Sequence, residues 1–444
     1  MVVGRAWRLA LLALPVGVWF LGRWLVQERS GRVSEKTLAD LINRYARFSA
    51  HLSGTEADAE TSKWVFEEVS KVGLEVGYQP YVLRDVWIPG KDGRSTGCQL
   101  ILAGQELPCY VVQQPPRRFH HLQTSMRRIL VVNVSEVYIP SAEDTYRSAM
   151  TNGTLPYDAV IVVNRVEGEE VTQPRPFDWN QSGSSPSLVP VVTVSKLQWF
   201  PANASVSLRL LGHWVSALRT RNVVAMSKVE AGCESRWRPV YMGTPMNGFF
   251  RAAGERGAGI AMLISLATML PRCACWLPIF GFTSGHEQSD PGISREIIPY
   301  LQRLAEQHEI RLADIPFISI GAGLGNYAQF EGLNSEGPGS GTARLMISTS
   351  LGHSGAHKMM EAVLQQLSKE KPSFMDLRPG AAFRAQGAVR PALLAGMPVM
   401  NLVSGDLRGR FHLPSDEDAS SVNLSSLVSI VDSFSRALAA AMCQ

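Results

Sequence analysis

The sequence lacks any block of Lys and Arg dense enough to predict a nucleic-acid-binding surface. Its net charge of +4 is spread along 444 residues, and the most basic stretches, residues 115–119 and 125–129, are short and typical of solvated loop edges. Charged residues are scarce, at 18%, whereas apolar residues make up 45%, a balance that excludes a disordered chain. We therefore expect a folded protein of two or three domains with no nucleic-acid partner.

The N-terminus lacks a clear small-x-small cleavage site, although it otherwise has the pattern of an export signal. Two arginines precede the apolar residues 9–22, and another arginine follows them. A stretch of this length is marginal for crossing a bilayer, although Trp19 and Trp24 suit a membrane interface. Residues 1–30 are thus predicted to be a cleaved signal peptide or a signal anchor, with a buried helix as the alternative. Either export interpretation places the main domain outside the cytoplasm, exported or anchored to the membrane through this segment.

The six cysteines lack the two-residue spacing of a zinc knuckle, since Cys273 and Cys275 are separated by one residue. Cys98 and Cys109 bracket residues 99–108, which are predicted to form a hairpin that one disulfide closes if the chain is exported. Five Asn-x-Ser/Thr sequons would matter only in a eukaryotic secretory route. They begin at Asn133, Asn152, Asn180, Asn203 and Asn423.

The hydrophobic pattern changes twice along the chain. Residues 35–48 have the apolar spacing of three and four that is typical of an amphipathic helix, and Thr55 is predicted to cap a second helix that ends at Gly73. Across residues 84–214, short β-branched runs alternate with turn residues, which predicts a β-rich unit without a long helix. Past Asn222, strands alternate with helices, as in an α/β sheet covered on both faces.

The β-rich unit therefore interrupts a single α/β domain. Residues 36–83 and 215–443 are predicted to form a mostly parallel sheet flanked by helices, and residues 84–214 an inserted β-rich domain. The predicted strands include residues 129–134, 158–164, 239–243, 277–282, 315–321 and 397–403.

Polar side chains follow the predicted strands, at the edge where α/β sheets bind their ligands. They fall in four segments, MGTPMNG (242–248), AGERG (253–257), SGHEQ (284–288) and FHLPSDED (411–418). In this order and spacing the segments resemble the co-catalytic zinc exopeptidases of the bacterial leucyl aminopeptidase type, a family that includes carboxypeptidase Q and the glutaminyl cyclases. The resemblance covers roughly the predicted α/β domain, and the insert resembles the protease-associated domain of some members. It implies a metal-dependent hydrolase of peptides or similar small amides.

The sequence departs from this family at the ligands that belong to one zinc alone. The family has a His-x-Asp after a strand, whose His serves this zinc, and here the two ligand positions hold Pro245 and Asn247. The family also has an Asp about thirty residues after its Glu-Glu pair, and residues 315–321 carry none. The resemblance therefore implies that this zinc has been lost, together with ordinary two-zinc aminopeptidase activity.

The three positions of the other zinc still hold side chains that can bind metal. Glu255 stands for the Asp of the family's D-N-x-S-G motif, Glu287 for the second Glu of the Glu-Glu pair, and His412 for the His of H-T-x-x-D. Three protein ligands and a water make an open catalytic zinc site, as in the glutaminyl cyclases. The resemblance implies at most one zinc ion on these residues, with Asp416 beside the site.

His286 stands where the family has the Glu that deprotonates the metal-bound water, so the resemblance implies that His286 is the catalytic base. Each of these residues also has a non-catalytic interpretation. Glu255 can stabilise a helix N-terminus while Arg256 pairs elsewhere, and His286 with Glu287 can be a polar pair at a strand end. His412 and Asp416 can form a hydrogen-bonded loop clip. Solvated or core positions are predicted for His353 and His357.

Three functions remain open on these observations. The first is a divergent peptidase-like hydrolase of peptides or amides with one zinc and His286 as base. The second is a catalytically inactive homologue that binds a partner. The third is a glutaminyl-cyclase-like acyltransferase, for which the altered base is unfavourable.

Overall fold

The computed structural model describes most of the chain after the N-terminal segment. Residues 1–30, predicted as a signal peptide or anchor, lie outside the described residues, and so does His412. The described residues are 32–48, 50–90, 97–111, 115–117, 119–134, 157–164, 189–194, 200–227, 238–270, 275–288, 290–325, 345–370, 375–380, 387–404 and 416–443.

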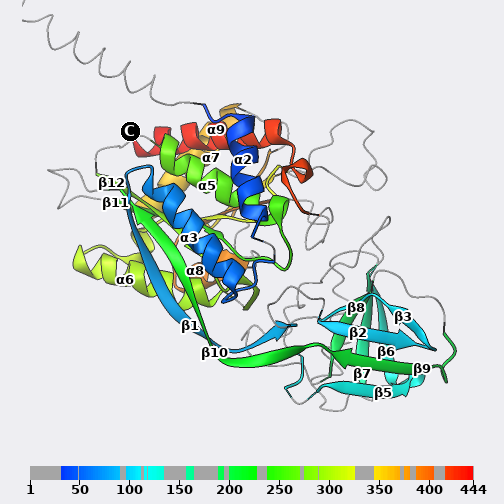
Figure 1. Cartoon of the computed structure of the whole chain (residues 1–444). Helices are drawn as coiled ribbons and strands as arrows, with labels where there is room; N and C mark the ends of the chain where they lie inside the picture. The colour runs from blue at the N-terminus through cyan, green and yellow to red at the C-terminus, as the bar shows by residue number, and fades with distance from the viewer. Residues whose placement is uncertain are drawn as a thin grey trace, which may run out of the picture.

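An eight-stranded sheet with the order β1-β10-β12-β11-β13-β16-β14-β15 forms the centre of the larger domain (Figure 1). Strands β12, β11, β13 and β16 are parallel to one another, whereas β10 and β14 run antiparallel to their neighbours β12 and β16. The predicted α/β class is confirmed, with a mixed sheet whose centre is parallel. The strands are β1 (Glu75–Pro89), β10 (Gly212–Met226), β11 (Arg238–Pro245), β12 (Trp276–Thr283), β13 (Phe317–Ile320), β14 (Leu345–Thr349), β15 (Met375–Pro379) and β16 (Val399–Ser404).

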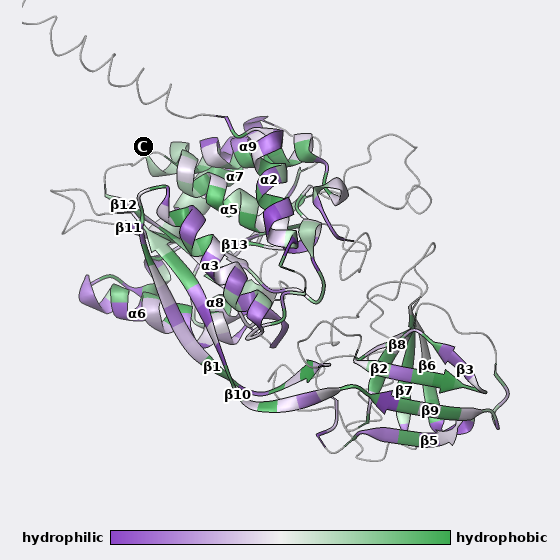
Figure 2. Cartoon of the chain, viewed as in Figure 1, coloured by the Kyte–Doolittle hydropathy of each residue, from purple (hydrophilic) through white to green (hydrophobic). Residues whose placement is uncertain are grey.

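Helices cover both faces of this sheet because alternate strand residues point to opposite sides. In β11, Val240 and Met242 belong to a core shared with α2, α3, α5, α7 and α9, whereas Tyr241 belongs to a second core shared with α6 and α8. Helix α5 lies within the first core and is hydrophobic almost all round, whereas α6 carries hydrophilic residues on its outer side (Figure 2). The helices are α2 (Glu35–Ala46), α3 (Glu56–Ser70), α5 (Ala258–Met269), α6 (Ile298–Gln307), α7 (Gly355–Glu370), α8 (Arg390–Leu394) and α9 (Leu424–Met442).

Helix α9 has the length and hydropathy of a membrane span, and it is the one helix in the described part of the chain that does. It nevertheless packs against α7, and Phe434 and Leu438 are completely buried in the core. An ion pair of 2.7 Å between Arg436 and Glu370 joins the two helices at the surface. These contacts identify α9 as a core helix of the α/β domain.

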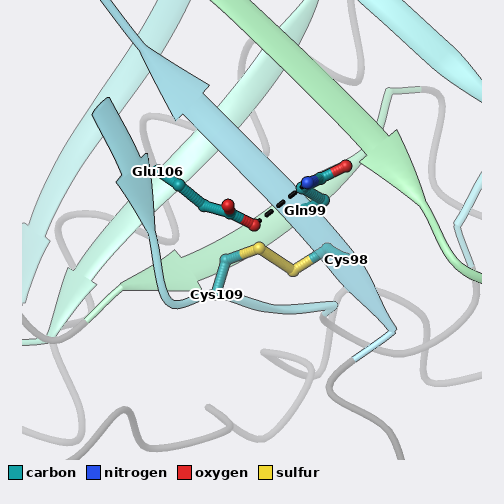
Figure 3. Close-up of a disulfide and its surroundings, with 4 residues drawn as sticks. All are labelled: Cys98, Gln99, Glu106 and Cys109. Carbon is teal, nitrogen blue, oxygen red and sulfur yellow. Dashed lines mark hydrogen bonds between the residues drawn. A yellow bond between two sulfur atoms is a disulfide. The ribbon is translucent and has the colours of Figure 1, made fainter. Parts of the chain in front are cut away.

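The insert contains two four-stranded sheets, with the orders β3-β2-β9-β5 and β4-β8-β7-β6. Apolar residues of both sheets form one core, so the sheets pack face to face. A disulfide between Cys98 in β2 and Cys109, just before β4, joins the two sheets with a Cα separation of 5.9 Å (Figure 3). The strands are β2 (Cys98–Leu102), β3 (Gln105–Leu107), β4 (Tyr110–Val111), β5 (His121–Ser125), β6 (Ile129–Val134), β7 (Ala159–Asn164), β8 (Val191–Val194) and β9 (Ser205–Leu210).

Strands β1 and β10 connect the insert to the α/β domain as a long antiparallel arm (Figure 1). They pair from Glu75 with Met226 at one end to Pro89 with Gly212 at the other, but β10 pairs with β12 only over residues 223–226. The domain boundaries predicted from the sequence, before residue 84 and after residue 214, fall inside this arm. Strand periodicity continues without interruption from one domain into the other, so it does not mark the boundary.

Candidate functional site at the carboxyl ends of the strands

The carboxyl ends of β11 and β12 lie side by side, because Pro245 pairs with Thr283. Asn247 follows β11 by two residues, and a short 3-10 turn after β12 carries His286 and Glu287. A π-helical turn, Ala253–Gly257, carries Glu255 into α5. The structure therefore gathers the described candidate residues at one edge of the sheet.

The carboxylate of Asp416 fixes the π-helical turn. Its Oδ1 accepts hydrogen bonds from the backbone N–H of Gly254 (2.7 Å) and from the hydroxyl of Ser421 (2.6 Å), and its Oδ2 accepts from the N–H of Glu255 (2.8 Å). The N–H groups of Gly254 and Glu255 are among those that a helix start leaves without a partner in the helix itself. Burial raises the pKa of Asp416 to about 6, although the three hydrogen bonds lower it and the Glu255 carboxylate raises it further. Asp416 thus serves the backbone of this turn.

Arg256 lies between the two glutamates for which the sequence predicts a metal ion. Its Nη2 is 2.9 Å from Oε1 of Glu255 and 3.2 Å from Oε1 of Glu287, and all three side chains are at most 3% exposed. Its Nε donates a hydrogen bond of 2.8 Å to the carbonyl of Asn247. Burial lowers the pKa of Arg256, but the Glu255 and Glu287 carboxylates outweigh burial and raise the pKa overall. A permanent cation therefore occupies the space between the two carboxylates.

Asn247, at one position of the lost zinc, takes part in a buried hydrogen-bond network instead. Its Nδ2 donates to Oδ1 of Asp58 (2.8 Å) and to Oγ of Ser284 (3.1 Å). Asp58, in the first turn of α3, also accepts from the N–H of Gly54 (2.7 Å) and from the hydroxyl of Thr220 in β10 (2.6 Å). Burial raises the pKa of Asp58, and these hydrogen bonds oppose the rise. The network joins α3 to the middle of β10 and to the residues that follow β11 and β12.

The two histidines near the site are both held by neighbouring side chains. Nδ1 of His286 lies 2.7 Å from Oδ1 of Asp290, and the His286 side chain is 6% exposed. His51 is completely buried, stacks on Tyr45 with ring centroids 3.9 Å apart, and places Nδ1 2.9 Å from Oγ1 of Thr61. Burial lowers the pKa of His51 to about 3, so this ring is neutral at physiological pH.

The described residues do not fit a zinc ion. Pro245 has no side-chain donor atom, the amide of Asn247 is hydrogen-bonded to Asp58, and a guanidinium lies against both Glu255 and Glu287. No group of three or more His, Cys, Asp or Glu side chains that could hold a metal occurs in the described part of the chain. The predicted third ligand, His412, lies outside the described residues.

Two functional features of this edge were missed by the sequence reasoning. Asp58 was not singled out from the sequence, because its partners Asn247 and Thr220 are distant in sequence. Arg256 was expected to pair elsewhere if Glu255 stabilised the helix start, but it pairs with both glutamates. One signal was available in the sequence. Arg256 directly follows Glu255, a predicted metal ligand, and an arginine at that position can place its positive charge where the metal ion would lie.

Comparison with known proteins identifies which solved structures share this fold. No protein-family model and no curated protein sequence matches the chain. Among solved structures, the zinc aminopeptidase BSAP from Bacillus subtilis matches with a TM-score of 0.66 and 16% identity, covering 93% of this chain and 95% of its own. The peptidase M28 precursor from Shewanella amazonensis SB2B matches with a TM-score of 0.64 and 14% identity, covering 95% and 96% respectively. The chain has the zinc aminopeptidase fold.

A further neighbour, the aminopeptidase from Aneurinibacillus sp. strain AM-1, has a TM-score of 0.62 at 12% identity, with 93% of this chain and 95% of that chain covered. These matches confirm, at the level of the fold, the family resemblance predicted from the motifs. Because the sequence identities are low, the matches establish the fold and leave the chemistry to the residues of the site.

Proposed function

We propose that this protein is a non-catalytic homologue of the zinc aminopeptidases, which binds a partner and neither holds zinc nor cleaves peptides. The observation that carries the proposal is the position of Arg256 between Glu255 and Glu287. These are the two described residues that a single-zinc site would need. The guanidinium supplies the positive charge that both carboxylates require when they are buried.

Electrostatics opposes a zinc ion at the same place. Zinc lies about 2.0–2.2 Å from a carboxylate oxygen, and Nη2 of Arg256 is already within 3.2 Å of an oxygen on each glutamate. A dication about 4 Å from a guanidinium is repelled by roughly 8 kcal/mol at an effective dielectric constant of about 20. Moving the arginine away instead would leave a buried cation without its partners.

The catalytic alternatives both depend on this ion. A hydrolase with His286 as base needs a metal-bound water to deprotonate, and a glutaminyl-cyclase-like acyltransferase needs the same ligand set. The imidazole of His286 lies with Nδ1 against Asp290. Without a metal ion to bind a water molecule, His286 has no substrate for the role of base. The contacts of Arg256 therefore favour the non-catalytic alternative, with a peptide or similar amide as the class of ligand that the fold suggests.

We also propose that the protein works outside the cytoplasm, exported or anchored through residues 1–30, with its insert acting as a protease-associated-like domain. The disulfide between Cys98 and Cys109 supports this location, and Cys275 and Cys443 are disulfide-bonded as well. Disulfides persist in oxidising compartments and are rare in the cytosol.

The test is metal content measured together with activity. The full chain, purified without chelators, is analysed for zinc by mass spectrometry and assayed on aminoacyl anilides and on a peptide with N-terminal Gln, with and without added zinc. We expect less than about one zinc per ten chains and no turnover above a no-enzyme blank. One zinc per chain, with activity that chelation removes and zinc restores, would refute the proposal.

A further inference from the structure

The number of sequons exceeds what chance provides. The chain has 12 asparagines, and five of them begin an Asn-x-Ser/Thr sequon. Ser and Thr together fill 58 of the 444 positions, so chance would complete about one or two sequons among these asparagines. The excess points to modification in a secretory pathway, where disulfides such as Cys98–Cys109 also form. The structure then decides which of the described sequons is presented for modification.

Asn203 lies on the surface of the insert in a well-defined turn before β9. The N–H of Ala204 donates to the carbonyl of Pro201 (2.9 Å), and the carbonyl of Ala204 accepts from the N–H of Met126 (3.0 Å). Asn203 and Ser205 are exposed, whereas Ala204 between them is buried. The carboxamide and the hydroxyl of this sequon thus face solvent together, and the middle residue faces the core.

The other described sequons are presented differently. Asn423 is half-buried and caps the N-terminus of α9, where its Oδ1 accepts from the N–H of Ser426 (3.1 Å) and from the hydroxyl of Ser425 (2.8 Å). Asn133 lies within β6, where its backbone is paired with Val163 of β7. Neither residue lies on an exposed turn as Asn203 does, since one caps a helix and the other lies within a strand. Asn152 and Asn180 lie outside the described residues.

We propose that Asn203 is an N-glycosylation site, a modification that rests on the export proposed above and is independent of whether the protein is catalytic. The Nδ2 atom forms a bond to the anomeric carbon of an oligosaccharide that is donated from a lipid diphosphate. The bond between that carbon and the diphosphate oxygen breaks, the lipid diphosphate leaves, and Nδ2 loses one proton. At this position the sugar extends into solvent from the start of β9 and displaces no residue of the core shared by the two sheets of the insert.

The test is site mapping of the full chain produced in mammalian cells and purified from the medium or from the membrane fraction. Glycans are removed with peptide N-glycosidase F in ¹⁸O-water, and peptide mass spectrometry then reads the occupied asparagines. We expect Asn203 to be occupied in most chains. The variants Asn203→Gln and Ser205→Ala should both abolish this signal and lower the protein mass by the same single-glycan increment. Asn423→Gln serves as the matched control and should leave the signal at Asn203 unchanged.

The peptide map of the wild-type protein decides the outcome even if a variant is not secreted. Asn203 found unmodified, whether or not other sequons carry glycans, overturns the proposal. Occupancy at Asn203 that persists in Ser205→Ala also overturns it, because the sequon would then not direct the modification.

Discussion

Arg256 is a buried cation in contact with two buried carboxylates, so each of the three groups lies against an opposite charge. Replacing Arg256 with Met keeps the volume similar but leaves Glu255 and Glu287 without a counter-charge. We expect the free energy of unfolding to fall by about 3–5 kcal/mol at pH 7, the usual result of breaking a buried ion pair from one side. Urea denaturation monitored by circular dichroism measures this change.

Two further variants separate charge from packing. Arg251→Met changes an exposed arginine close to Arg256 in sequence, whose ion pair with Glu417 is 3.8 Å long, and should alter stability by less than about 1 kcal/mol. In a background with Glu255→Gln and Glu287→Gln, the loss caused by Arg256→Met should shrink, because neither of the two groups that pair with Arg256 is then charged. An equal loss in both backgrounds would mean that Arg256 acts through packing alone.

Asp416 gives the site a pH dependence with a defined sign. Its folded-state pKa, raised to about 6 by burial, exceeds the unfolded value of about 3.9. Its contribution to stability is therefore fully present below the unfolded pKa and is lost as pH rises through the folded pKa. Between pH 4 and pH 7, the free energy of unfolding of the wild-type protein should fall by about 2 kcal/mol through this group. Thermal denaturation across this pH range measures the slope.

The variant Asp416→Asn removes this titration while keeping one oxygen acceptor for the turn. Its stability should be lower overall, since one acceptor of the Gly254, Glu255 and Ser421 hydrogen bonds is lost. Between pH 4 and pH 7, its free energy of unfolding should change less steeply with pH than that of the wild type. A slope identical to the wild type would assign the pH dependence to other carboxylates.

At the scale of elements, the hydrogen bonds of Asp58 hold α3 against the middle of β10 and the residues that follow β11 and β12. Restoring the family's carboxylate with Asn247→Asp would place two buried carboxylates against each other and raise their pKa values. The variant should lose about 2–4 kcal/mol more stability at pH 8 than at pH 5, because a raised folded-state pKa stabilises only below it. Urea denaturation at the two pH values gives the comparison.

The neutral variant Asn247→Ala tests whether charge is the cause. It removes the hydrogen bonds to Asp58 and Ser284 without adding a carboxylate, and should cost about 1–3 kcal/mol with little change between the two pH values. Gln302→Ala, on the exposed side of α6, is a control for ordinary surface substitution. If Asn247→Asp showed no additional loss at pH 8, the network would tolerate a second charge.

Elements with a strong local pattern were predictable from the sequence. The helix expected at residues 35–48 is α2, and the strand expected at residues 129–134 has the same bounds as β6. Strands β14 and β15 were not predicted, because each has only five residues. The burial of β14 alternates, but its sequence LMIST does not, and β15 is only partly buried. The π-helical turn at Ala253–Gly257 was also missed, since it depends on Asp416, which is far away in sequence.

The position of the candidate site in the fold was predictable from the sequence, but the interactions of its side chains were not. The motifs located the strand ends correctly, because their order follows the order of strands along the chain. The partners of each side chain depend on contacts between distant segments, as Asp58 with Asn247 shows. Arg256 and Glu255 are neighbours in sequence, yet their joint contact with Glu287 exists only once β12 lies beside β11.

At the scale of the whole molecule, the insert has the features of an independently stable unit. Its two sheets enclose their own core, and the arm of β1 and β10 connects it to the α/β domain. An edge-on contact between Tyr110 of the insert and Phe250, with ring centroids 5.3 Å apart, also links the two domains. A single small contact of this kind adds about 0.5–1.5 kcal/mol, so we expect the domains to unfold separately.

The disulfide between Cys98 and Cys109 allows this independence to be tested. It closes a loop with a sequence separation of 11 residues and joins the two sheets, so removing it should destabilise the insert by about 3 kcal/mol. In the double variant Cys98→Ala/Cys109→Ala, amide hydrogen exchange should accelerate in β2 and β9, while β11 and β13 keep the wild-type rate. Calorimetry should show the insert transition at lower temperature and the second transition unchanged. If exchange accelerated equally in both domains, they would unfold as one cooperative unit, with the arm transmitting stability between their cores.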